Sequence, residues 1–305
     1  MISEKNKNSL VLFLKVAIII LAFYFIYSQL TKNDGFQWRN FEDQIKSKMS
    51  FWMVVLMFIF SVTNRFLEIL KWKNLVSTIA PISIKEATKQ VLAALTVGIV
   101  TPNGIGEYAG KALYFDKTKT KKIIFLNLIC NGIQMFLTII FGTIGLLFLG
   151  YWEWALAIIG LLILFIVFSI LSKNIKVKGY SIKKLYKKIN EIPKRIHQKN
   201  NLLALCRYVV FSHQYYFLFL AFDIDLPYFT MMATITTVYF LASSLPSFQF
   251  LDFAVKGSMA VFFFGKLGIN EWIIIFITML MWFLNVALPV LIGSIYVIRF
   301  KRYQN

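Results

Sequence analysis

Long apolar runs are the feature of this sequence that most constrains what it can fold into. The runs 9–30, 123–150 and 273–298 each reach the roughly 18–20 residues that an α-helix needs to cross the hydrocarbon core of a bilayer. Over its 305 residues the chain is 58% hydrophobic and only 15% charged, whereas soluble domains carry about 25% charged residues. The sequence therefore predicts an all-α, polytopic membrane protein.

Further apolar segments add to these runs and predict about six to seven long transmembrane helices in a single membrane domain over 1–305. Two apolar segments are interrupted, one around Pro102, Gly104 and Gly106 and the other at Pro246. Proline and glycine break helices, so we expect two broken or re-entrant helical hairpins at these places. The long helices are expected over 9–30, 51–70, 123–149, 154–171, 202–222 and 272–298.

The net charge of +19 lies mainly in the gaps between the apolar runs, where lysines gather. The loop 173–200 holds ten Lys and Arg residues against one acid, Glu191. Because basic loops stay in the cytoplasm, we expect this loop and both termini on the cytoplasmic side of a bacterial inner membrane. Anionic lipid headgroups are the expected partners of these charges, and nucleic acid is not. A homo-oligomer and a soluble enzyme partner are left open.

The sequence carries no motif that is typical of an enzyme. It has no glycine-rich nucleotide loop, no nucleophile elbow and no metal-ligand spacing, and its histidines are His197 and His213. Cys130 and Cys206 both fall inside apolar segments, so neither a disulfide nor a metal site is expected. We therefore expect a protein that has no cofactor and is not an enzyme.

Two short motifs share one pattern, in which a proline is followed by an acid five or six residues later and by a lysine four residues after the acid. The spacing of four places acid and lysine on one face of a helix, where they can pair. One motif lies in the half 1–150 and the other in the half 151–305, and the expected topology gives the halves opposite orientations. This pattern predicts an inverted repeat like that of many transporters. The motif residues are Pro102, Glu107 and Lys111 in the first half, and Pro246, Asp252 and Lys256 in the second.

Three motifs give the chain a resemblance to a known family. They are Arg65-x6-Trp72, Pro102 followed by Gly106-Glu107 and a basic residue at Lys111, and the proline–acid element 246–252. On these motifs the chain resembles, over nearly its whole length, the membrane domain of lysylphosphatidylglycerol synthases and the stand-alone flippase-like membrane proteins. The resemblance implies a membrane domain that moves lipids between leaflets. Because the chain stops at Asn305, we expect the stand-alone form, without the cytoplasmic aminoacyl-transfer domain of bifunctional relatives.

Other polar side chains in apolar segments join the two acid–lysine pairs as candidate pathway residues. In the segment 123–149, polar residues recur at spacings of four and three and form one stripe, which either hydrogen-bonds between helices or lines a cavity. His213 either relays protons or is a packing residue. Arg65, near Glu68 at a helix end, fits an ion pair, snorkelling or a headgroup contact. The candidates are Glu107, Lys111, Asp252, Lys256, Asn127, Asn131, Gln134, Arg65, His213 and Asn285.

The sequence favours a flippase-like lipid translocator, in which a phospholipid or modified lipid moves between leaflets and buried lysines meet its headgroup. The acids of the two pairs would balance the lysine charge while the site is empty. Two alternatives stay open: a membrane-embedded transferase that acts on a lipid headgroup, and a membrane scaffold that binds a soluble enzyme through the loop 173–200.

Overall fold

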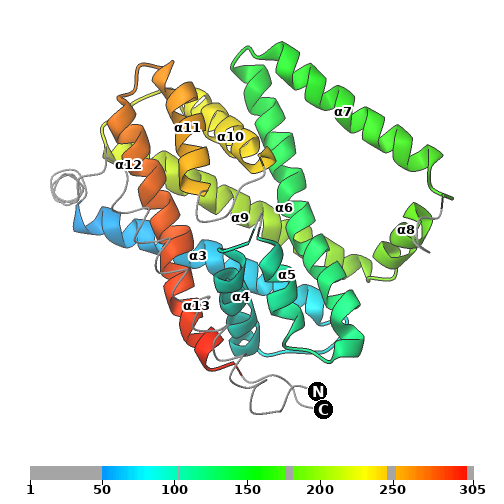
Figure 1. The fold of residues 1–305 in the computed structure, drawn as a ribbon. Helices are drawn as coiled ribbons and strands as arrows, with labels where there is room; N and C mark the ends of the chain where they lie inside the picture. Colours follow the sequence, from blue (N-terminus) through cyan, green and yellow to red (C-terminus); the bar gives the residue numbers. More distant parts are fainter. Residues whose placement is uncertain (1–49, 102–103, 176–180, 246–251, 301–305) are drawn as a thin grey trace.

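The computed structural model describes residues 50–101, 104–175, 181–245 and 252–300. Their regular structure is helical throughout, and the helices form a bundle from which one arm extends (Figure 1). The prediction of an all-α protein is therefore confirmed for this part of the chain. The helix expected over 9–30 and the two prolines Pro102 and Pro246 lie outside the described residues.

The helices of the described residues follow one another with short connections. Their bounds are α3 Phe51–Val76, α4 Ile84–Gly98, α5 Ile105–Ala112, a 3₁₀ turn Lys117–Lys119, α6 Thr120–Phe148, α7 Trp152–Leu171, α8 Ile182–Asn190, α9 Lys194–Ala221, α10 Tyr228–Ser244, α11 Asp252–Gly265, α12 Glu271–Trp282, a π turn Phe283–Ala287 and α13 Leu288–Ile298. Four of these stretches are long and apolar enough to cross a membrane: α3, the 3₁₀ turn with α6, α7, and the continuous helix from α12 to α13. They fit a multi-pass membrane protein.

α4 and α5 form a hairpin that short side chains hold in place. α4 begins with a capping box, in which Ser83 Oγ accepts from the Glu86 N–H at 3.2 Å and the Glu86 carboxylate accepts from the Ser83 N–H at 2.8 Å. At the reversal, Thr101 Oγ1 accepts from the Gly106 N–H at 2.8 Å. Gly104 takes a left-handed φ of 66°, a conformation that favours glycine. The chain therefore folds back, and α5 packs on α4.

The long helices α3 and α9 pack against each other across the middle of the bundle (Figure 1). α6 packs on α10, α13 packs on α4, and α11 contacts both α10 and α12. The largest apolar core joins α9, α10, α11 and α12, with Tyr215, Phe219 and Phe264 among its buried side chains. A second core, which includes Trp72 and Leu126, joins α3, α4 and α6. The packing therefore brings residues from both halves of the chain to the centre.

Glycines let two of these helix pairs approach closely. A Cβ on Gly145 of α6 would lie 2.5 Å from the Ala233 carbonyl oxygen and 2.6 Å from the Thr237 hydroxyl, both on α10. On α13, a Cβ at Gly293 would overlap Thr96 of α4. Small residues allow close contact between backbones, which stabilises helix pairs where lipid is the solvent. The pairs α6–α10 and α4–α13 are therefore joined by direct contact with a helix backbone.

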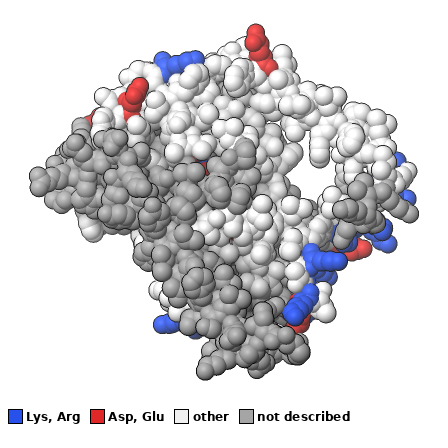
Figure 2. Space-filling model, in the orientation of Figure 1, with Lys and Arg blue, Asp and Glu red and all other residues white. Residues whose placement is uncertain are grey.

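α7 is the arm in Figure 1, and it stands away from the bundle. Only Ala155 and Ser169 of this helix are buried, and its neighbour is mainly α6. In Figure 2 most charged side chains of the described residues lie along the upper edge and toward the right and lower edges of the visible face, and the described surface between them is largely uncharged. This distribution suits a protein whose middle band faces lipid.

Candidate functional site

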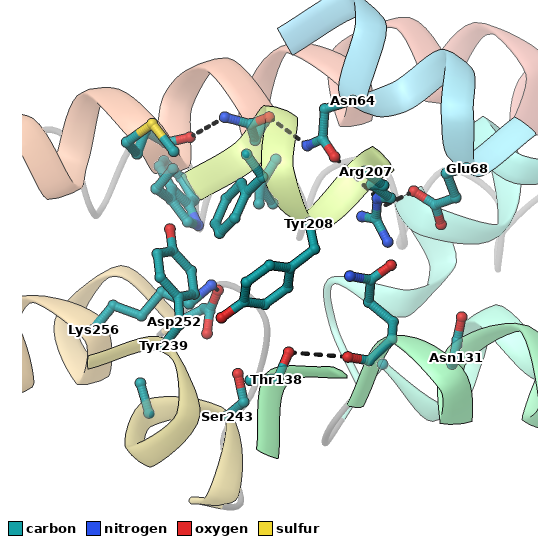
Figure 3. A pocket seen from close by; sticks show the side chains of 18 of the residues that line it. Asn64, Glu68, Asn131, Thr138, Arg207, Tyr208, Tyr239, Ser243, Asp252 and Lys256 are labelled. Carbon is teal, nitrogen blue, oxygen red and sulfur yellow. Dashed lines mark hydrogen bonds and ion pairs between the residues drawn. The ribbon is translucent and has the colours of Figure 1, made fainter. Parts of the chain in front are cut away.

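A cavity of about 410 Å³ lies inside the bundle, where α3, α6, α9, α10, α11 and α12 approach one another (Figure 3). Leu95 of α4, Glu107 of α5 and Asn285 of the π turn also line it. Its wall is therefore built from both halves of the chain. The volume is in the range of about 300–1,000 Å³ that is usual for ligand sites.

Seven of the ten candidate residues from the sequence line this cavity. The polar stripe on α6 contributes Asn131 and Gln134, with Thr138 one turn further along. The structure thus places this part of the stripe in the cavity wall. Gly104, at the hairpin reversal, also lines the cavity. The seven candidates are Arg65, Glu107, Asn131, Gln134, Asp252, Lys256 and Asn285.

Lys111 and Asn127 lie behind the wall, and both are fully buried. The Lys111 ammonium donates to Asn127 Oδ1 at 2.7 Å and lies 4.8 Å from the centre of the Trp72 ring. Trp72 in turn donates from Nε1 to Gln90 Oε1 at 2.7 Å. The ammonium that the sequence predicts to pair with Glu107 therefore has an amide and an aromatic face as partners, while Glu107 lines the cavity.

His213 lies outside the cavity lining, on the surface of α9. Its ring nitrogens lie 2.9 Å from the Val209 carbonyl oxygen and 2.9 Å from the Tyr228 hydroxyl of α10. A proton relay through the cavity needs a partner inside it, whereas the Val209 contact stays within α9 and the Tyr228 contact links α9 to α10. The structure favours the packing alternative for this residue.

A largely buried ion-pair cluster of Arg65, Glu68 and Arg207, here called the arginine cluster, occupies one end of the cavity (Figure 3). Glu68 of α3 is paired with Arg65 on the same helix and with Arg207 of α9, whose Nη2 lies 3.3 Å from Glu68 Oε2. The side chain of Glu68 is 8% exposed. Arg207 also donates from Nε to Asn64 Oδ1 at 3.0 Å. In the cluster, one carboxylate faces two guanidinium groups that do not lose their protons, so the cluster carries an excess positive charge.

The last helix contributes a backbone carbonyl to the arginine cluster. Arg65 donates from Nη2 to the Asn285 carbonyl oxygen at 2.5 Å. In a regular helix that oxygen accepts from the N–H four residues later, but this position is Pro289, which has no N–H. The Asn285 side chain accepts from Asn64 Nδ2 at 2.7 Å and donates to Gln214 Oε1 at 2.9 Å. Pro289 therefore leaves the Asn285 carbonyl oxygen available as an acceptor for Arg65.

The other end of the cavity holds Asp252 and Lys256 of α11 (Figure 3). The predicted pairing at a spacing of four is confirmed, because the two side chains form an ion pair and are 22% and 21% exposed. The Lys256 ammonium lies 5.0 Å from the centre of the Tyr239 ring of α10. This pair is neutral as a unit, in contrast to the arginine cluster.

Among the residues that the structure describes, five basic side chains stand against three acidic ones in the wall and directly behind it. The fifth base is Lys71, which is fully buried and donates from Nζ to Gln134 Oε1 at 3.3 Å. Because buried charge without a partner is costly, this excess favours an anionic ligand. The bases are Arg65, Lys71, Lys111, Arg207 and Lys256, and the acids are Glu68, Glu107 and Asp252.

Arg207 and Tyr208 are among the residues of this wall that sequence reasoning did not identify. Arg207 falls inside the apolar helix expected over 202–222, and an arginine inside an apolar segment is a signal that could have found it. Tyr208 has no such signal, because tyrosines are common at membrane interfaces for reasons unrelated to a site.

The function of this cavity is indicated neither by a metal-binding group of side chains nor by similarity to a known protein. Within the part of the chain that the structure describes, no group of three or more His, Cys, Asp or Glu side chains could hold a metal ion. No model of a known protein family matches the chain, and no curated protein matches it either.

Proposed function

We propose that this protein is a flippase-like lipid translocator, in which the headgroup of an anionic lipid crosses the membrane through the central cavity. The observation that carries the proposal is a cavity of about 410 Å³ in an apolar bundle, lined in part by polar and charged side chains, with an excess of basic over acidic side chains among the described residues in and behind its wall. A charged headgroup meets a high barrier in hydrocarbon, and polar partners inside a protein lower it. The acyl chains would stay in the surrounding lipid.

The arginine cluster supplies the partner for a lipid phosphate. In the structure, Glu68 is bound by both Arg65 and Arg207. An entering phosphate would replace Glu68 as the partner of Arg207, because guanidinium groups bind phosphate oxygens through paired hydrogen bonds. When the phosphate leaves, Glu68 returns to both arginines. The exchange keeps every buried guanidinium paired, which avoids the cost of an isolated buried charge.

The packing of the helices supports an inverted repeat of the halves 1–150 and 151–305. In this repeat α3 corresponds to α9, the hairpin α4–α5 to α10–α11, and α6 to the continuous helix α12–α13. α3 packs on its own counterpart α9, α6 packs on α10, and α13 packs on α4. A two-fold axis between the halves would produce this set of contacts. It exchanges α3 with α9, and it turns the contact of α6 with α10 into the contact of α13 with α4. The two acid–lysine motifs then lie on equivalent helices, α5 and α11.

Cysteine labelling is expected to place Asn270 outside the cell and Lys187 in the cytoplasm. Asn270 precedes α12, Lys187 lies in the basic helix α8, and both are exposed. In a background in which the exposed Cys206 is replaced by serine, Asn270→Cys should react with an impermeant maleimide in intact cells. Lys187→Cys should react only after permeabilisation. Reaction of both cysteines from the same side would contradict the proposed orientation and the bacterial inner-membrane topology with cytoplasmic termini.

Removal of the cavity lysine is expected to slow lipid movement by about tenfold or more, the effect of losing one charged contact. Lys256→Met keeps the length of the side chain but removes its charge from the cavity wall. The rate is measured as leaflet exchange of fluorescent phosphatidylglycerol in liposomes that contain the purified protein. Lys266→Met is the matched control, since this lysine is exposed and lies just beyond the end of α11.

The same assay separates the translocator from its alternatives. A wild-type protein that moves no lipid would contradict the proposal, and a wild-type rate for Lys256→Met would exclude this end of the cavity from the pathway. Lipid that is recovered in a chemically altered form, as seen by mass spectrometry, would indicate a headgroup transferase. Lipid that neither moves nor changes would favour a membrane scaffold for a soluble enzyme.

A further inference from the structure

Tyr208 is a tyrosine of the cavity wall whose hydroxyl has no hydrogen-bond partner among the described residues. The residue is 6% exposed, and its ring is stacked on Phe141 of α6 with the ring centres 4.8 Å apart. In Figure 3 the ring points into the cavity, between the arginine cluster and the Asp252–Lys256 pair. Buried polar groups are almost always paired, because an unpaired one lowers stability. A hydroxyl that is kept unpaired in a cavity wall points to a ligand.

Two neutral hydroxyl groups, in addition to the Asp252–Lys256 pair, are drawn near the Tyr208 ring in Figure 3. Thr138 and Ser243 are drawn on the same side of the cavity in Figure 3, and both line it. Thr138 donates to the Gln134 carbonyl oxygen at 3.0 Å, so its own oxygen keeps its capacity to accept. A hydroxyl both donates and accepts, whereas a guanidinium only donates. This part of the cavity therefore matches a ligand group that also does both, namely an alcohol.

We infer that the transported headgroup is a hydroxyl-bearing phosphodiester, such as a glycerol or sugar phosphate, with its phosphate at Arg207 and a hydroxyl at Tyr208. The inference rests on the proposed translocator function. Arg207 and Tyr208 are adjacent on α9 and both line the cavity, so the two ligand groups lie within a few bonds of each other. An ammonium headgroup fits less well, because basic side chains outnumber acidic ones among the described residues in and behind the wall, and Glu68 and Asp252 are already paired.

The test compares two lipids of equal charge in liposomes that contain the full-length protein. Phosphatidylglycerol and phosphatidylpropanol share the phosphodiester and the acyl chains, but only phosphatidylglycerol has headgroup hydroxyls. Wild-type protein is expected to move phosphatidylglycerol about tenfold faster or more, because a site that bonds a hydroxyl rejects the analogue without it. Tyr208→Phe removes one oxygen and keeps the ring on Phe141. It should slow phosphatidylglycerol about tenfold and leave phosphatidylpropanol unchanged.

Tyr215→Phe is the matched control on α9. The Tyr215 hydroxyl is already hydrogen-bonded to Thr278 Oγ1 at 2.6 Å, so its loss should leave the ratio of the two lipid rates unchanged. Equal wild-type rates for the two lipids would overturn the inference and leave the translocator proposal standing. Movement of neither lipid would overturn both. Equal slowing of both lipids by Tyr208→Phe would show that the hydroxyl does not contact a headgroup hydroxyl, which also overturns the inference.

Discussion

Glu68→Gln is expected to lower the free energy of unfolding by about 3–5 kcal/mol, the cost of leaving a buried charge without its partner. Glu68 faces Arg65 and Arg207, and its own side chain is 8% exposed. Glutamine keeps the shape of the side chain and removes its negative charge. The two guanidinium groups cannot lose a proton to escape the penalty. The variant should therefore unfold at a markedly lower temperature in detergent, as followed by tryptophan fluorescence.

Two further variants separate the loss of charge from other effects. Glu191→Gln makes the same chemical change at an exposed position and should unfold at the wild-type temperature. Arg207→Gln added to Glu68→Gln removes one of the two facing positive charges, so the double variant should regain part of the lost stability. An unfolding temperature of Glu68→Gln equal to that of the wild type would show that Glu68 does not hold the two arginines together.

Gly145→Ala is expected to force α6 and α10 apart. The new Cβ would lie 2.5 Å from the Ala233 carbonyl oxygen and 2.6 Å from the hydroxyls of Thr236 and Thr237, which is closer than atoms pack in protein interiors. One of these atoms belongs to the backbone of α10, so the clash is not relieved by a change of rotamer. Overpacking of this kind costs about 1–3 kcal/mol, or more when a backbone must move. A lower unfolding temperature and less monodisperse protein in detergent should follow.

Gly132 provides the control on the same helix. A Cβ at Gly132 meets no atom within 4 Å. Gly132→Ala should therefore be neutral or should stabilise the protein by up to about 1 kcal/mol, since alanine is the better helix former. If Gly145→Ala were tolerated as well as Gly132→Ala, the close contact between α6 and α10 would be wrong.

Features that depend on residues close in the sequence could be predicted. Hydropathy located α3, α6, α7 and the continuous helix α12–α13, because the bilayer selects long apolar segments. The spacing of four predicted the Asp252–Lys256 ion pair, because both residues belong to one helix. α9 begins at Lys194 and not at the expected residue 202. Its first two turns are polar, and hydropathy detects only the apolar part of a helix.

Features that depend on contacts between helices could not be predicted. Lys111 has the same spacing from Glu107 as Lys256 has from Asp252, yet its ammonium donates to Asn127 of α6. The spacing of residues determines which of them share a helix face, whereas the helix packed against that face determines which side chains they contact. The pairing of Arg207 with the carboxylate of α3 depends in the same way on the contact between α3 and α9.

The π turn between α12 and α13 divides the last helix into two faces that can vary separately. Thr278 and Trp282 of α12 line the cavity, whereas Gly293 of α13 fits against α4. A π turn holds one residue more than the α-helical turn that it replaces, so it changes the rotation of α13 relative to α12. Because the cavity residues of α12 and Gly293 of α13 lie on opposite sides of this turn, a substitution in α13 can adjust the fit to α4 without replacing a cavity residue. Ligand preference and bundle assembly can in this way evolve independently within one continuous helix.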